Sequence, residues 1–181
     1  MKKLVFIFSC ILSCTDLLNG QNIISIKEEA GSFPIVSALG TSAVYVDTGD
    51  YWLVNKSAGF LRDDIQRVTG VKPVLANRLP VSAGNIIIIG SLDHSALIQQ
   101  LAAADKISID PIKGKWESFV IQVVEHPFKG ISRALVIAGS DRRGAAFGTL
   151  ELSRQMGVSP WYWWADVPVK RKKEIYVKRT G

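Results

Sequence analysis

The sequence predicts an α/β fold, a two-layer or three-layer sandwich with a mixed β-sheet and about three helices. Apolar runs such as Asn85–Gly90 and Ala134–Ala138 are typical of buried strands. Each run is followed by a turn and then by apolar residues at the three- to four-residue spacing of an amphipathic helix. Strands that alternate with helices in this way build layered α/β domains.

The first 22 residues have the pattern of a signal peptide, and we exclude them from the fold. A basic start at Lys2-Lys3 precedes the apolar run Leu4–Cys14, which is too short to span a bilayer as a helix. Two kinds of processing fit this segment, cleavage near Gly20 or lipid attachment at Cys14. We therefore expect an exported protein, periplasmic or at the cell surface, with the lipoprotein form as an alternative.

The remaining residues, 23–181, have the length of one domain and not of two. Both cysteines, Cys10 and Cys14, lie in the signal segment, so the domain has no disulfide. The full chain has a net charge of +6, and this modest positive charge fits an acidic polysaccharide partner and an ordinary surface equally well. Much of it lies in Lys170–Lys173, which we interpret as a solvated turn before a final strand. The pattern of a nucleic-acid-binding module is missing.

The chain up to Asp50 is extended, with two or three early strands followed by a helix. The β-rich runs are Ile23–Ile26, Pro34–Ser37 and Ala43–Asp47. Ala58, Leu61, Ile65 and Val68 mark one face of a helix from about Tyr51 to Thr69, ended by Gly70.

The middle of the chain continues the alternation of strands and helices. A short strand at Val74-Leu75 and the strand Asn85–Gly90 precede a helix that starts at Ser91 or Asp93 and ends near Lys106. Further strands are expected at Trp116–Val124, Ala134–Ala138 and Glu174–Val177.

The longest informative stretch is the helix after Gly139 and the loop that follows it. Ser140 or Asp141 can cap the helix, which we expect to begin near Asp141 and to end at Gly157. Its apolar face consists of Ala145, Thr149, Leu152 and Met156. Gly144 and Gly148 lie four residues apart, so another surface should approach the helix closely there.

An aromatic loop follows the helix. Trp161, Tyr162, Trp163 and Trp164 are consecutive, and two prolines bracket them. So many exposed rings are unfavourable unless another surface covers them.

The stretch Gly139–Pro168, GSDRRGAAFGTLELSRQMGVSPWYWWADVP, resembles the block that closes the N-terminal domain of glycoside hydrolase family 115, the xylan α-1,2-glucuronidases. Weaker similarity extends over Asp50–Val54, Asp64–Pro73 and Gly114–Ser118. The resemblance covers nearly all of residues 23–181. It implies the α/β accessory domain that precedes a (β/α)8 catalytic barrel, similar to the domain before the barrel of β-hexosaminidases.

The resemblance also implies a function. Family 115 enzymes remove glucuronic acid or its 4-O-methyl ether from glucuronoxylan or xylo-oligosaccharides. We expect this chain to be the N-terminal part of such an enzyme, without the barrel that holds the catalytic residues, and therefore inactive alone. The resemblance implies no cofactor. It implies the chain's own missing barrel as a partner, and allows a homodimer of the full-length enzyme.

Six residues are candidates for contact with substrate. Glu117 follows Trp116, and Asp166 comes shortly after the pair Trp163-Trp164; sugar pockets combine aromatic faces with carboxylates. Asp141, Arg142 and Arg143 stand at a helix start, where arginine can pair with a uronic acid. Trp164 completes the set. Each has a structural alternative as a cap, a surface charge or a contact with the next domain.

Two other classes of function stay open. The turns Ile89–Ser91 and Ala138–Ser140 could cradle a phosphate, although the spacing of dinucleotide and P-loop motifs is missing. A secreted carbohydrate-binding module without catalysis would use exposed aromatic rings. His94 and His126 lack partners at ligand spacing, so the sequence predicts no metal site.

Overall fold

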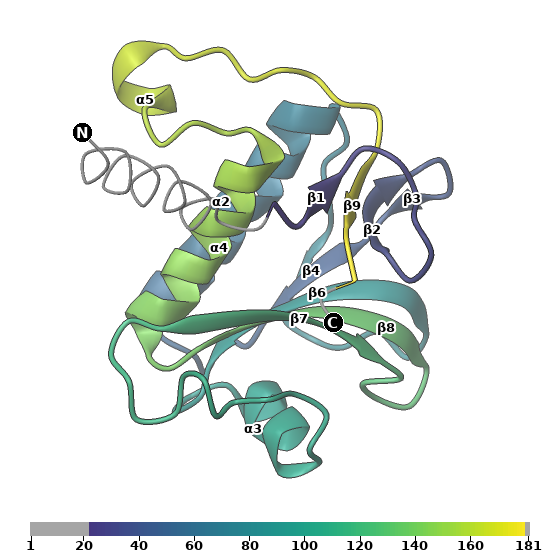
Figure 1. Ribbon diagram of the computed structural model, residues 1–181. Helices are drawn as coiled ribbons and strands as arrows, with labels where there is room; N and C mark the ends of the chain where they lie inside the picture. Colours follow the sequence, from purple (N-terminus) through teal and green to yellow (C-terminus); the bar gives the residue numbers. More distant parts are fainter. Residues whose placement is uncertain (1–21, 180–181) are drawn as a thin grey trace, which may run out of the picture.

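The computed structural model describes residues 22–179, and the signal segment therefore lies almost entirely outside the described residues. A five-stranded sheet forms the centre (Figure 1). Its strands, in spatial order, are β5 (Leu75–Ala76), β4 (Ala43–Val46), β6 (Ala83–Ser91), β8 (Ile131–Gly139) and β7 (Phe119–Glu125). The pairs β5–β4, β4–β6 and β6–β8 are parallel, whereas β7 is antiparallel to β8. The mixed sheet is confirmed.

Helices lie on both faces of this sheet. The two long helices, α2 (Trp52–Thr69) and α4 (Arg142–Met156), pack together on one face, and α3 (Ala96–Ala103) lies on the other (Figure 1). The isoleucines of β6 alternate between the two cores, since Ile87 and Ile89 face α2 and α4 while Ile86 and Ile88 face α3. A strand buried on both faces therefore needs a continuous apolar run.

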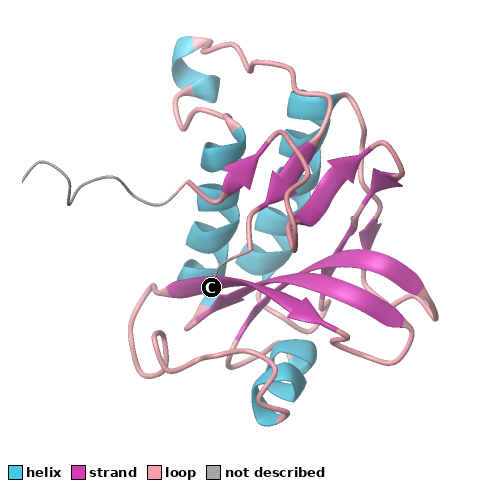
Figure 2. Ribbon diagram, turned by 45° about the vertical axis from the view of Figure 1, so that its right-hand side comes forward, coloured by secondary structure: helices cyan, strands magenta, loops and turns pink. Residues whose placement is uncertain are grey.

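A second, four-stranded antiparallel sheet shares the face of α2 and α4 (Figure 2). Its order is β1 (Ile24–Ser25), β9 (Ile175–Val177), β2 (Phe33–Ser37) and β3 (Gly40–Thr41). Its buried residues, such as Phe33 and Ile175, join the core beneath the two long helices. The sequence indicates most of these strands but not that they leave the central sheet, because their partners are distant in the chain.

The long helices match the expected ones closely. Both end at glycines in the left-handed conformation, Gly70 with φ 84° and Gly157 with φ 104°. The side chain of Asp141, and not that of Ser140, caps α4. Ala145, Thr149, Leu152 and Met156 are buried as expected, and α4 begins at Arg142.

Two expected boundaries are wrong. Helix α3 begins at Ala96 with Ser95 as its cap, because Ser91 ends β6 as a buried residue bonded to Asp50. Strand β7 begins at Phe119 and not at Trp116, because Glu117 has a left-handed backbone, φ 54°, that no strand residue adopts.

The basic run before β9 is more than a solvated turn. Lys172 Nζ donates to the Met156 carbonyl at the end of α4 (2.6 Å), and Arg171 Nη1 donates to Gln66 O near the end of α2 (3.4 Å). Cations at helix C-termini complement the helix dipole, and Lys172 also satisfies the last carbonyl of α4. This part of the run therefore ties the ends of the two long helices together.

The aromatic loop contains one turn of helix, α5 (Tyr162–Ala165). None of the helices within residues 22–179 is long and apolar enough to cross a membrane.

Candidate functional site

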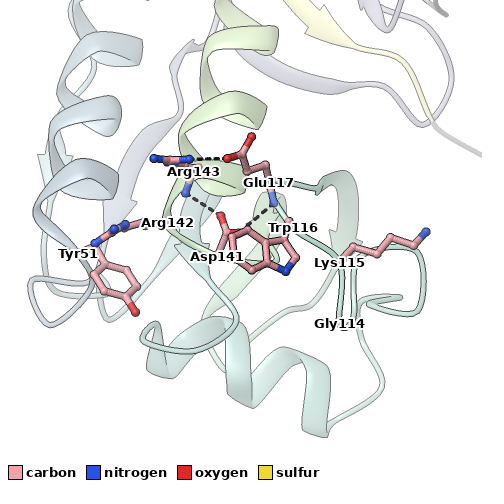
Figure 3. A pocket seen from close by; sticks show the side chains of 8 residues that line it. All are labelled: Tyr51, Gly114, Lys115, Trp116, Glu117, Asp141, Arg142 and Arg143. Atoms are coloured by element: carbon pink, nitrogen blue, oxygen red, sulfur yellow. Dashed lines mark hydrogen bonds and ion pairs between the residues drawn. The ribbon is translucent and has the colours of Figure 1, made fainter.

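A pocket of about 500 Å³ opens at the carboxyl edge of the parallel strands, beside the first turns of α2 and α4. Open α/β sheets commonly bind ligands at this edge. Figure 3 shows the lining residues: Tyr51, Gly114, Lys115, Trp116, Glu117, Asp141, Arg142 and Arg143. Four of the six candidates from the sequence, Glu117, Asp141, Arg142 and Arg143, therefore line one pocket.

Asp141 organises the pocket through its two carboxylate oxygens. Oδ1 accepts hydrogen bonds from the Arg143 and Gly144 NH groups, both at 2.8 Å. Oδ2 accepts from the Glu117 NH at 2.9 Å. Partial burial alone raises the pKa of Asp141, but these three NH donors outweigh it and hold that pKa below its ordinary value. The carboxylate joins the start of α4 to the loop before β7.

Two further contacts hold that loop against α4. The Ser118 NH donates to Ser140 Oγ (3.0 Å), and the Ser140 NH donates to Ser118 O (2.8 Å). At Gly144 an added Cβ would lie 2.2 Å from the Ser118 carbonyl oxygen. The expected close approach at Gly144 is thus made by the loop that carries Trp116 and Glu117.

The Glu117 side chain pairs with Arg143. Arg143 Nη1 lies 2.6 Å from Glu117 Oε1, and this hydrogen bond raises the pKa of Arg143 above its ordinary value. Both side chains are partly exposed, so the pair fixes geometry more than it stabilises the fold.

Tyr51 forms the opposite wall of the pocket. Its hydroxyl donates to Asp93 Oδ2 (2.7 Å), a bond that raises the pKa of Tyr51, and its ring lies 4.1 Å from that of His94. The Arg142 guanidinium stands over the Tyr51 ring, with Cζ 5.6 Å from the centroid. The Arg142 cation therefore lies over an aromatic ring that Asp93 and His94 hold in place.

The two strand-to-helix turns do not have the form of phosphate cradles. The buried Asp50 carboxylate accepts from the Ser91 NH and hydroxyl, at 2.7 and 2.8 Å, and Asp141 occupies the start of α4. A Cβ on Gly90 would meet Ser95 at 2.5 Å, so this glycine serves close packing. Carboxylates of the chain already accept from the NH groups that would bind an anion.

Asp166 and Trp164 lie elsewhere. Asp166 follows α5 in a left-handed conformation, and Trp164 is 83% exposed. They flank the end of α4, whose 15 residues separate them from Glu117 by a helix of about 22 Å. The structure therefore does not bring Asp166 near the other carboxylates.

The other four lining residues were not candidates from the sequence, namely Tyr51, Gly114, Lys115 and Trp116. Trp116 is 86% exposed, and its segment Gly114–Ser118 had already been singled out by resemblance. Among residues 22–179, no three His, Cys, Asp or Glu side chains gather as metal ligands would. The His94 ring packs against the Tyr51 ring at an angle of 43°.

Comparison with known proteins gives matches among solved structures. No family model matches the chain, and no curated protein does. Among solved structures, it matches one described as a novel family GH115 4-O-methyl-alpha-glucuronidase, BtGH115A, with specificity for decorated arabinogalactans. The identity is 33%, the TM-score is 0.61 and the match covers 78% of this chain. The chain spans only 17% of that enzyme. The resemblance to family 115 and the α/β sandwich are confirmed, and the domain is related to the glucuronidases.

Proposed function

We propose that this chain is the N-terminal α/β domain of an exported α-glucuronidase of glycoside hydrolase family 115. The observation that carries the proposal is the 33% identity to a family 115 enzyme over 78% of the chain, combined with the 17% share of that enzyme. In this proposal residues 1–22 are the signal peptide and residues 23–181 the domain, and Cys14 is the lipid attachment site if the protein is a lipoprotein. These assignments rest on the sequence alone.

The proposed substrate is a polysaccharide with glucuronic acid or 4-O-methylglucuronic acid side chains. The family resemblance favours glucuronoxylan, and the name of the solved enzyme adds decorated arabinogalactans as a second polymer. Release of an α-linked glucuronic acid side chain is proposed for both polymers. A comparison of uronic acid release from the two polymers identifies which polysaccharide is the substrate.

The catalytic carboxyl groups are proposed to come from the rest of the enzyme. Glycosidases place their two carboxyl groups about 5 to 10 Å apart across the scissile bond. Glu117 and Asp166 stand at opposite ends of α4 and do not form such a pair. The domain's own contribution is the pocket at the start of α4, which we propose to bind part of the substrate. No cofactor enters this proposal.

The aromatic surface at the other end of α4 is proposed to pack on the enzyme's catalytic barrel. Trp161 is 65% exposed and Trp164 83%, and Phe147 and Leu150 extend the exposed apolar surface along the outer side of α4. Large exposed rings in one region are typical of interaction surfaces. The chain covers only 17% of the solved family 115 enzyme, so the rest of such an enzyme is large enough to supply the partner. A homodimer of that enzyme would then form through other parts.

The test compares two proteins. One is the 181-residue chain, and the other is a chimera in which this chain replaces the matching part of the solved family 115 enzyme. We expect the chimera to release uronic acid from glucuronoxylan or decorated arabinogalactan, and the chain alone to release none. Release by the chain alone would overturn the accessory role. A chimera that folds, judged by circular dichroism, and yet is inactive would contradict the family function.

A carbohydrate-binding module without catalysis is the second candidate. The observation in its favour is that Trp52 and Trp116 are also exposed, by 76% and 86%. Retention of the isolated chain on xylan, together with an inactive chimera, would favour this reading.

A further inference from the structure

We propose that the pocket at the start of α4 binds the carboxylate of a glucuronic acid residue through Arg142, with Trp116 as the surface on which the sugar ring stacks. The identity of the sugar rests on the proposed function. The assignment of the two residues rests on the charges and contacts of the pocket itself.

Most charges in the pocket are already paired. Glu117 and Arg143 form an ion pair at 2.6 Å, and both Asp141 oxygens accept from backbone NH groups. Lys115 extends away from the other lining side chains (Figure 3). Within the described part of the chain, Arg142 forms no ion pair. Arg142 is therefore the cation that remains for an anionic ligand.

Arg142 is also held in place before any ligand arrives. Its guanidinium stacks over the Tyr51 ring at 5.6 Å, and the Tyr51 hydroxyl is bonded to Asp93. Stacking on a ring leaves the edge of the guanidinium free for the paired hydrogen bonds that a carboxylate accepts. A pre-positioned arginine loses less side-chain entropy on binding.

Trp116 supplies an apolar wall in the same pocket. Its backbone is fixed by neighbours, because the Glu117 NH is bonded to Asp141 and Ser118 is bonded to Ser140. Its indole is nevertheless 86% exposed. A sugar presents CH groups on its ring faces, which pack well on such a ring.

Glu117 supplies an acceptor for sugar hydroxyl groups. Its Oε1 accepts from Arg143, which leaves Oε2 for a ligand. An arginine for the carboxylate, an indole for the ring and a carboxylate oxygen for a hydroxyl suit a hexuronate. A neutral sugar would leave Arg142 without its partner, so the pocket should prefer glucuronate to glucose.

The test titrates the purified chain with sodium D-glucuronate and with D-glucose at constant ionic strength, using calorimetry and tryptophan fluorescence. We expect glucuronate to bind at least tenfold more tightly than glucose, the gain typical of a charge-assisted hydrogen bond. Arg142→Gln should remove this preference, and Trp116→Ala should weaken both sugars. Arg154→Gln is the matched control, since Arg154 lies on the same helix and pairs with Glu151.

Equal affinity for both sugars, or unchanged preference in Arg142→Gln, would overturn the inference. Arg142 is exposed, so its replacement should leave the melting temperature unchanged, and this is checked in the same samples. Failure here is separable from failure of the proposed function. A chimera that releases uronic acid while the chain ignores glucuronate would reject only the Arg142 site, whereas glucuronate binding with an inactive chimera would reject only the enzyme.

Discussion

The two ends of α4 are built differently. At its start, the side chains of Asp141 and Ser140 and the backbone of Gly144 are all in contact with the loop 114–118. At its end, Gly157 closes the helix, Lys172 donates to the last carbonyl, and Trp161 and Trp164 stand exposed. The first end is completed by the domain itself.

The difference assigns two roles to the two ends of one helix, ligand binding at the start of α4 and contact with a partner at its end. A preorganised pocket needs side chains fixed by their neighbours, and the start of α4 has them. An exposed aromatic surface is typical of a site that binds a partner, and the end of α4 has such a surface. Substitutions of Asp141 or Gly144, which contact the loop 114–118, should therefore affect stability in the isolated chain, whereas substitutions in the aromatic segment should not.

The largest effect is expected for Gly144→Ala. On helix propensity alone, alanine would stabilise α4 by roughly 1 kcal/mol. The added Cβ would instead lie 2.2 Å from the Ser118 carbonyl, a backbone atom that cannot turn aside, so we expect a loss of about 1 to 3 kcal/mol. Urea unfolding measures this change in the free energy of unfolding.

Gly59→Ala is the matched control, since a Cβ at Gly59 in α2 meets nothing within 4 Å. It should gain stability. If the unfolding free energy changed with the same sign in both glycine variants, the close contact between the loop and α4 would not govern stability.

Asp141→Ala should come next. Removal of an N-cap side chain costs about 0.5 to 2 kcal/mol, and here the Glu117 NH also loses its acceptor. Asp141→Asn should retain most of the cap. Chemical unfolding near neutral pH distinguishes the variants, and an Asp141→Ala protein as stable as the parent would contradict the role.

The charge of Asp141 also gives a pH dependence. Its folded-state pKa is depressed, so its stabilising contribution is present above the unfolded value of about 4 and is lost as the pH falls through the folded pKa. The stability difference between the parent and Asp141→Asn should therefore shrink below about pH 4. A difference that grows on acidification would contradict the lowered pKa.

Lys172→Met tests the far end of α4. It keeps the half-buried stem but removes the donor to Met156 O, with an expected loss of about 1 kcal/mol. Lys170→Met serves as the control because Lys170 is exposed and bonds to no helix carbonyl in the described structure. A similar loss of unfolding free energy in both lysine variants would contradict a stabilising role of the hydrogen bond from Lys172 to Met156 O.

Trp164→Ala should have the smallest effect in the isolated chain. A side chain that is 83% exposed contributes little, so the change in unfolding free energy should stay within about 0.5 kcal/mol. In the active chimera the same substitution should destabilise the enzyme, because the ring then lies in an interface. A large loss in the isolated chain would show that the domain covers Trp164 itself.

Much of the fold was predictable because its signals are local. The isoleucines of β6 marked a strand buried on both faces, and Asp141 and Gly157 marked the limits of α4. The predicted start of α3 was wrong because Ser91 and Ser95 are both suitable helix caps, and the sequence does not distinguish them. Only the tertiary bond from Ser91 to Asp50 decides between them.

The site was predictable in part. Glu117 and Asp141 were singled out separately, 24 positions apart, and only the antiparallel pairing of β7 with β8 brings them together. Tyr51 reaches the pocket from the other helix, which no local pattern shows. Asp166 was grouped with Glu117 because both come shortly after tryptophan, but the length of α4 separates them.

The most direct measurement follows backbone amide resonances of the purified chain during titration with D-glucuronate. We predict shifts around the start of α4, at Tyr51, Trp116, Glu117, Arg142 and Arg143, and none in the aromatic segment 161–167. Shifts confined to residues 161–167, or no shifts at millimolar glucuronate, would contradict the assignment of ligand binding to the start of α4.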